Sequence, residues 1–233
     1  MKMERIKVWD LPTRVFHWLL VVLIVAAVAT GKIGGSAIEW HGKIGLAIFG
    51  AIVFRIVWGL VGSSHARFAS FIPSPASLRA HLNGRWTGVG HNPLGALSVL
   101  ALLVLICIQV GTGLFGNDDI AFQGPLFHLI EKSMSDWLTG IHKWSINLLV
   151  ALIALHLGAI FYYAKIKKEK LVKPMLTGWK DVQAGHGKSA TGGGIVAFVV
   201  ALALALGAVY AVSGPWLERP AASVEKATST PAW

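Results

Sequence analysis

Long apolar stretches alternate with short polar connections along the whole chain. The apolar stretches cover residues 15–31, 44–62, 93–115, 137–164 and 194–214. Crossing the hydrocarbon core of a bilayer takes roughly 20 helical residues. Backbone polar groups in lipid must be hydrogen-bonded within their own segment, so the pattern predicts helices. We therefore expect an all-α integral membrane protein with a four-helix transmembrane bundle and a fifth, C-terminal transmembrane helix.

Composition supports a membrane protein over a soluble one. Hydrophobic residues make up 55% of the chain, charged residues 14%, and the mean hydropathy is +0.62. A soluble domain carries about 25% charged residues. The net charge of +10 resides mainly on residues beside the apolar stretches. We interpret it as an orientation signal at an anionic membrane surface and expect no nucleic-acid partner.

The distribution of lysine and arginine predicts the orientation. Fourteen of these residues lie on the side that holds the N-terminus and the second-to-third and fourth-to-fifth connections, against six on the other side. Because basic loops stay in the cytoplasm, we expect a multi-pass protein of the bacterial inner membrane with a cytoplasmic N-terminus and a periplasmic C-terminus. The predicted division is a transmembrane domain at 1–182, a cytoplasmic linker at 183–193, the additional helix at 194–214 and a disordered periplasmic tail at 215–233.

Cysteine usage excludes several kinds of site. The chain has a single cysteine, Cys107, inside an apolar stretch. A disulfide within the chain, a multi-cysteine zinc site and an iron–sulfur cluster are therefore excluded. The chain has no CxxCH sequence, which also excludes covalent attachment of a c-type haem.

Four of the nine histidines lie inside or at the edge of the apolar stretches. Ionisable residues at membrane depth are costly, so each is a functional candidate. Two of them, His142 and His156, are fourteen residues apart in one stretch. At 100° and 1.5 Å per residue they share one helix face and are separated by roughly 21 Å along it.

The predicted topology sorts the four histidines by depth. His17 lies where the first helix starts, on the same side as His156, while His41 lies where the second helix starts, on the same side as His142. Two imidazoles facing each other across a bundle match the two axial positions of a haem iron. Two histidines are too few for a zinc site, and no Asp or Glu lies inside the five stretches to complete one. We expect these pairs to be iron ligands.

Three basic residues are candidates for binding the carboxylates of such cofactors. Arg55 lies fourteen residues after His41, on nearly the same helix face. It either meets a haem propionate or instead extends to the interface or pairs with Asp10. Lys43 and Lys143 follow the second pair of histidines and either meet propionates or remain solvated.

Several segments together resemble a known family. They are WDLPTRVFHW at 9–18, HGKIG at 41–45, IHKW at 141–144, HLGAIFYY at 156–163 and LVKPMLTGWK at 171–180. The set is similar to the bacterial dihaem cytochrome b561 family, which includes the cytochrome b subunits of membrane nickel–iron hydrogenases. The likeness covers roughly residues 5–182, so the fifth helix and the tail exceed the minimal four-helix form.

The resemblance implies two non-covalent b-type haems, one held by His17 and His156 and the other by His41 and His142. It also implies electron transfer between the membrane quinone pool and a periplasmic redox partner, such as a c-type cytochrome or a hydrogenase-like oxidoreductase subunit. A homodimer is possible.

Two alternative functions remain at this point. The chain could be a superoxide:quinone oxidoreductase, but the mixture of acidic and basic residues on the outer side does not favour an anionic substrate. It could also be a haem-free transporter or membrane anchor that uses its histidines structurally. The sequence does not identify the quinone pocket.

Overall fold

Five long helices form the body of the protein in a computed structural model, which describes residues 2–120, 122–185 and 187–213. They are α1 (Leu11–Ile33), α2 (Ala37–Val61), α5 (Pro93–Leu114), α6 (Lys132–Lys165) and α8 (Ile195–Ser213). Within the described residues, these five helices are long and apolar enough to cross a membrane. The predicted all-α membrane fold is therefore confirmed. The fourth span, α6, begins five residues before the predicted stretch.

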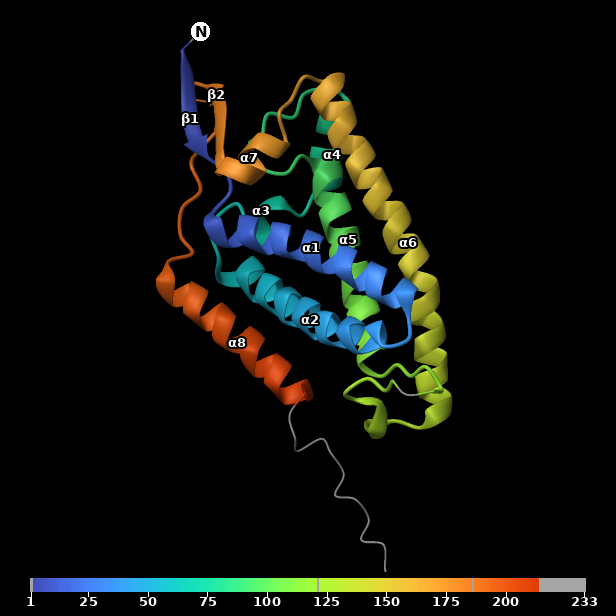
Figure 1. The fold of residues 1–233 in the computed structure, drawn as a ribbon. Coiled ribbons are helices and arrows are strands. Elements are labelled where there is room, and N and C mark those ends of the chain that lie inside the picture. Colours follow the sequence, from blue (N-terminus) through green and yellow to red (C-terminus); the bar gives the residue numbers. More distant parts are fainter. Residues whose placement is uncertain (1, 121, 186, 214–233) are drawn as a thin grey trace, which may run out of the picture.

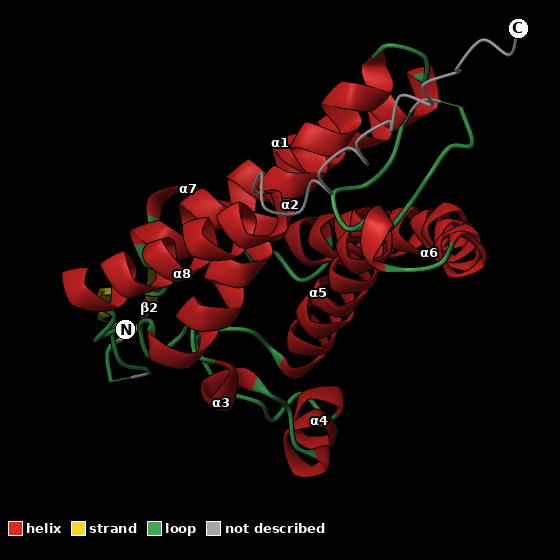
Figure 2. Cartoon of the chain, turned by 90° about the horizontal axis from the view of Figure 1, so that it is seen from below, coloured by secondary structure: helices red, strands yellow, loops and turns green. Residues whose placement is uncertain are grey.

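The spans form two helical hairpins and an added helix (Figures 1 and 2). Helices α1 and α2 pack against each other, as do α5 and α6, and α2 contacts α5 to join the two hairpins. The added helix α8 lies along α2. Viewed down the molecule, α1, α2 and α8 form one group, with α5 and α6 beside it. Groups bound between the hairpins can thus contact helices from both.

A central apolar cluster joins four of the helices. Its buried members are Phe16, Leu20, Ile48, Ile52, Ile106 and Leu149, which come from α1, α2, α5 and α6. Many other large apolar side chains on these helices are exposed, among them Val22 and Leu155. Exposed apolar faces of this extent match lipid contact and confirm a multi-pass membrane protein.

Local sequence signals determine where the helices begin. Asp10 is the N-cap of α1, and its carboxylate accepts a hydrogen bond from the Thr13 backbone amide at 2.7 Å. Asn92 caps α5 in the same way, accepting from the Gly95 amide at 2.7 Å. Such side chains satisfy backbone donors that have no partner in the first helical turn. The caps fix where the two helices enter the bundle.

Small elements cover one end of the bundle, which we call the cap end. They are β1 (Met3–Lys7), β2 (Trp179–Gln183), α3 (Phe68–Phe71), α4 (Pro75–Leu82) and α7 (Val172–Thr177). Strands β1 and β2 pair antiparallel, with Met3 opposite Gln183 and Lys7 opposite Trp179. At the opposite end, which we call the loop end, a short turn joins α1 to α2. A longer loop, which contains the 3₁₀ turn η1 (Phe127–Leu129), joins α5 to α6.

The cap end contains structure that the sequence did not reveal. Each strand has five residues and is too short to stand out by alternation, and the two lie far apart in the chain. The segment after β2, expected to be a linker, is held against the cap: the Ala190 amide donates to the Lys7 carbonyl and the Ser64 amide to the Thr191 carbonyl. The proposed tail at 215–233 lies outside the described residues.

Helix α8 covers one side of α2. Trp58 and Phe54 of α2 contact Ala201 and Phe198 of α8 in a compact aromatic cluster. At Gly50, an added Cβ atom would lie 2.9 Å from Val209 Cγ2. The absence of a side chain there lets the two helices approach closely, as small residues do in membrane bundles.

Candidate cofactor site

The loop end brings His41 and His142 together from the two hairpins. His41 lies in the second turn of α2, and His142 lies on α6, the corresponding helix of the other hairpin. Their ring centroids are 5.9 Å apart, and the ring planes meet at 87°. Two imidazoles on opposite faces of one iron, with metal–nitrogen bonds of about 2 Å, have ring centres roughly 6 Å apart. The observed separation fits that arrangement.

Backbone carbonyls fix the tautomer of both rings. His41 Nδ1 lies 2.8 Å from the Ala27 carbonyl oxygen, and His142 Nδ1 lies 2.8 Å from the Gln109 carbonyl oxygen. A carbonyl oxygen can only accept, so each Nδ1 carries the proton. The lone pair of each Nε2 is therefore free for a metal, and a hydrogen bond on the other ring nitrogen is the usual support for a metal-binding histidine.

A cavity of about 370 Å³ lies beside these two histidines. Its walls come from α1, α2, α5, α6 and the loop between the last two, and they include Ile24, Ile48, Ile106 and Leu149. Gly45, one turn after His41, also lines the cavity, and a Cβ atom at this position would meet no atom within 4 Å. This mostly apolar space, next to two free Nε2 atoms, fits a porphyrin.

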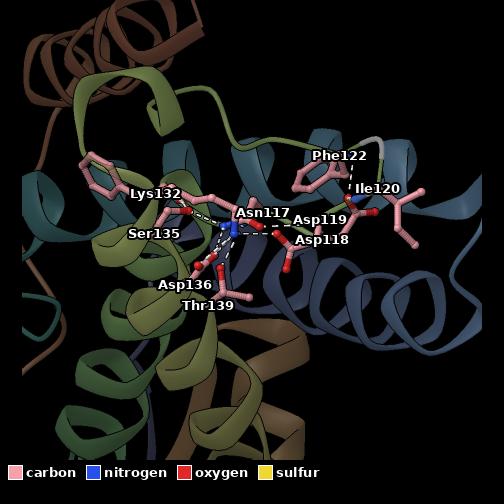
Figure 3. Close-up of polar contacts among 10 residues, drawn as sticks. Asn117, Asp118, Asp119, Ile120, Phe122, Lys132, Ser135, Asp136 and Thr139 are labelled. Carbon is pink, nitrogen blue, oxygen red and sulfur yellow. Dashed lines mark hydrogen bonds and ion pairs between the residues drawn. The ribbon is translucent and has the colours of Figure 1, made fainter.

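A polar network holds the long loop over this cavity (Figure 3). The Asn117 side chain donates to Ser135 Oγ at 2.6 Å and to the Asp136 carboxylate at 2.9 Å, while its backbone amide donates to Thr139 Oγ1 at 3.1 Å. Lys132 forms ion pairs with Asp119 at 2.7 Å and with Asp136 at 2.8 Å. These contacts tie the loop to the first turns of α6.

The loop also contributes directly to the cavity wall. Phe122 lines the cavity and lies against α2, where a Cβ atom on Gly42 would be 2.7 Å from its ring. The backbone amide of Phe122 donates to the Asp118 carboxylate at 2.8 Å. Phe122 and its loop neighbours Asn117 and Asp118 therefore form part of the cavity wall at the loop end.

His17 and His156 lie on facing helices nearer the cap end. They are close enough to interact electrostatically, and both are half-buried. His17 Nδ1 is buried and has no hydrogen-bond partner among the described residues. The structure thus brings these two histidines together, but it does not hold their rings by carbonyls as it holds those at the loop end.

Arg55 is buried at the cap end, with 3% of its surface exposed. Its guanidinium carbon lies 4.8 Å from the Phe68 ring centroid and 6.0 Å from that of Phe71. It interacts electrostatically with Asp10, and its Nη1 has no hydrogen-bond partner in the part of the chain that the structure describes. The Arg55 guanidinium therefore has the negative charge of Asp10 nearby, and its buried Nη1 remains available to donate to an oxygen of a ligand.

The two lysines predicted near the cofactors differ in position. Lys143 lines the cavity beside His142. Lys43 is exposed, and its Nζ lies 4.9 Å from the ring centroid of Trp40 in a cation–π contact. Lys32, which was not predicted, also lines the cavity. Lys143 and Lys32 are therefore better placed than Lys43 to meet an acidic group there.

Two further histidines are enclosed by the cap. His91 packs against Trp9 and Phe71, with ring centroids 4.5 and 4.7 Å apart. Burial is the main cause that lowers the pKa of His91 to about 3, and the charge of Arg55 and the neighbouring imidazole of His65 act in the same direction. Burial also lowers the pKa of His65, against the effect of a hydrogen bond to the Val8 backbone. Both are expected to be neutral at physiological pH.

Gln109 is a site residue that the sequence reasoning missed. Besides its carbonyl bond to the His142 ring, its side-chain Nε2 donates to the His142 carbonyl at 3.2 Å. Its Oε1 accepts from Ser145 Oγ at 2.5 Å. A lone amide inside an apolar stretch is itself a signal, because polar groups at membrane depth need partners.

Comparison with known proteins gives a consistent picture. A family model described as prokaryotic cytochrome b561 matches residues 8–178, which contain all four histidines of the two pairs. Helix α8 lies beyond the matched range. No solved structure gives a significant match.

Three relatives are described as probable Ni/Fe-hydrogenase B-type cytochrome subunits. That of Azotobacter vinelandii is 24% identical and that of Azotobacter chroococcum mcd 1 is 22% identical, each match covering 77% of this chain and 90% of the relative. The hydrogenase 1 subunit of Escherichia coli K12 is 21% identical, over 76% of this chain and 92% of the relative.

Proposed function

Since the chain belongs to the prokaryotic cytochrome b561 family and is a membrane b-type cytochrome of electron transport, we propose that it binds two b-type haems and transfers electrons between membrane quinone and a periplasmic redox protein. The observation that carries the proposal is the facing pair His41 and His142. A ring separation of 5.9 Å, with both Nδ1 atoms on backbone carbonyls, leaves two Nε2 atoms for one iron.

The second haem is proposed between His17 and His156. The two residues lie on different hairpins and interact electrostatically. His156 is fourteen residues from His142 on α6, roughly 21 Å along the helix, so the two cannot share an iron. Two sites at different depths would provide one-electron carriers near both membrane surfaces.

The chain's own residues would hold, orient and enclose these cofactors. Haem would supply the one-electron couple, and the imidazoles of these histidines together with burial would tune its potential. The Nη1 of Arg55 and the ammonium group of Lys143 are proposed to bind propionates, and Lys32 is better placed than Lys43 to add a third contact. The apolar cavity wall and the loop held by Asn117 would exclude water from the loop-end site.

We propose that the cap end faces the cytoplasm and the loop end the periplasm of the bacterial inner membrane. The basic residues of the cap-end connections support this orientation. Because the similar proteins are probable hydrogenase cytochrome subunits, a hydrogenase-like subunit is the favoured class of periplasmic partner, with a c-type cytochrome as the other. Family membership argues against the haem-free transporter.

Haem content in histidine variants tests the proposal. Wild-type protein should contain two b-type haems per chain by pyridine haemochrome. Each single alanine variant should lose or perturb one haem, and the four should form two spectral classes: His17 with His156, and His41 with His142. The exposed His128 supplies a control, H128A, which should match wild type. A ratio of one haem in wild type, or His17 grouping with His41, would contradict the proposal.

A further inference from the structure

The loop-end histidines are held by the same arrangement in both hairpins. In the first, the Ala27 carbonyl of α1 binds Nδ1 of His41, and Gly31 follows four residues later on the same helix. A Cβ atom on Gly31 would lie 2.9 Å from His41 Nδ1 and 3.0 Å from Cε1. The imidazole therefore occupies the space that a side chain at position 31 would need.

The second hairpin repeats the pattern. The Gln109 carbonyl of α5 binds Nδ1 of His142, and Gly113 follows four residues later. A Cβ atom on Gly113 would lie 3.1 Å from His142 Cε1 and 3.3 Å from Nδ1. Residues four apart lie one above the other on a helix face. The carbonyl and the glycine thus form one continuous surface for the ring.

We propose that Gly31 and Gly113 are positioning residues that set the planes of the two imidazoles at the loop-end haem. The inference rests on the proposed ligation of that haem by His41 and His142. Each glycine allows its ring to reach the carbonyl one turn away, and together the two contacts give the mutual angle of 87°. The glycines act only by positioning the histidine rings, and they neither bind the iron nor take part in electron transfer.

Ring orientation has a spectroscopic signature of its own. The axial ligands set the electronic structure of the haem iron, and the Nδ1 hydrogen bond raises the basicity of the imidazole. The relative angle of two axial imidazoles changes the anisotropy of the low-spin ferric signal in electron paramagnetic resonance (EPR). A ring displaced from its carbonyl should therefore alter this signal and the reduction potential of one haem.

The two glycines should differ in sensitivity. A methyl group at position 31 overlaps the His41 ring, which must move away from the Ala27 carbonyl. At position 113 the closest contact is slightly longer, and a movement of a few tenths of an ångström relieves it. G31A should therefore cause the larger change and G113A a smaller change in the same haem.

Gly111 provides a matched control on the same helix as Gly113. It is exposed, and an added Cβ atom would meet nothing within 4 Å. G111A introduces the same methyl group and the same change in helix propensity without touching a histidine. Full-length wild type, G31A, G113A and G111A would be purified with their haems and compared by haem-to-protein ratio, ferric EPR and redox titration.

The expected result is a shift in one of the two low-spin ferric signals, and this shift should be larger in G31A than in G113A. The other signal should stay as in wild type in both variants. Both signals of G111A should match those of wild type. Loss of one haem in G31A, with a shifted signal in G113A, would also support the proposal. Unchanged signals in both variants at full haem content would overturn it, as would equal changes in G111A. If H41A left both haems unperturbed, the ligation itself would be wrong, whatever the glycine variants showed.

Discussion

The Gln109 side chain should stabilise the contact between α5 and α6 without determining haem ligation. Replacement by leucine retains the approximate size of the side chain and leaves the backbone carbonyl that binds the His142 ring. It removes the bond from Nε2 to the His142 carbonyl at 3.2 Å and the bond from Ser145 Oγ at 2.5 Å. The variant Q109L therefore separates the side-chain bonds from the bond that orients the ring.

The size of the effect follows from these two bonds. Hydrogen bonds between membrane helices contribute about 0.6 kcal/mol on average and about 1.7 kcal/mol at most. Loss of both should lower the free energy of unfolding by about 1–3 kcal/mol. For chains of 150–250 residues, each kcal/mol shifts the thermal midpoint by about 2–4 °C, so Q109L should unfold roughly 2–12 °C below wild type.

A double-mutant cycle provides the assay. Wild type, Q109L, S145A and the double variant would be unfolded thermally while haem absorbance and intrinsic fluorescence are followed. S145A should cost less than Q109L, because it removes only one of the two bonds. The double variant should cost less than the sum of the single variants, since both lose the same Ser145–Gln109 bond.

Three results would refute this reasoning. Additive costs would show that Ser145 and Gln109 do not interact as the geometry indicates. A strong perturbation of the loop-end haem in Q109L, equal to that of H142A, would show that the side chain and not the backbone carbonyl supports the His142 ring. Wild-type stability in Q109L would show that neither bond contributes.

Three further predictions concern charge and orientation. With Cys107 replaced by serine, a cysteine at the exposed position Lys188 should be labelled from the cytoplasm and one at Lys32 from the periplasm; the opposite labelling would reverse the topology. R55Q should lower the reduction potential of the haem held at the cap end, because a buried positive charge favours the reduced form, and redox titration showing an unchanged potential would remove Arg55 from the cofactor site. Because the pKa of His91 is lowered to about 3, the unfolded state binds one more proton than the folded state between about pH 6.5 and 3. The free energy of unfolding should therefore decrease as the pH is lowered through this window. The thermal midpoint of H91F should decrease less than that of wild type over the same pH window. Identical pH profiles of the two proteins would contradict the lowered pKa of His91.

The spans were readable from the sequence because apolar length is local information, and the expected depth of the histidines rests on local spacing in the same way. Apolar length identifies a membrane helix, and a spacing of fourteen residues places His142 and His156 on one face at two depths. The structure adds that Asp10 and Asn92 cap α1 and α5, a role that residues of these types commonly have at helix starts. The predicted helices correspond closely to the observed ones, and the family assignment is confirmed.

The remaining features depend on contacts between distant segments. Pairing of Met3 with Gln183 has no local signature, because a strand of five residues is stabilised by its partner. The roles of Gly31 and Gly113 follow only from the distances of their Cα atoms to rings on another helix. Glycine is common throughout the spans, and Gly111 has no such neighbour, so the sequence could not distinguish them.

The pairing of β1 with β2 has a consequence for the timing of biogenesis. The strand Met3–Lys7 is synthesised first but cannot pair until translation has passed Gln183. At about 5–20 residues per second, this interval is roughly 10–40 seconds. All three helices that carry the four histidines, α1, α2 and α6, are made within it, while the cap remains incomplete. The cap end therefore stays open during insertion, which leaves a period for cofactor loading before the first and last parts of the core domain close together.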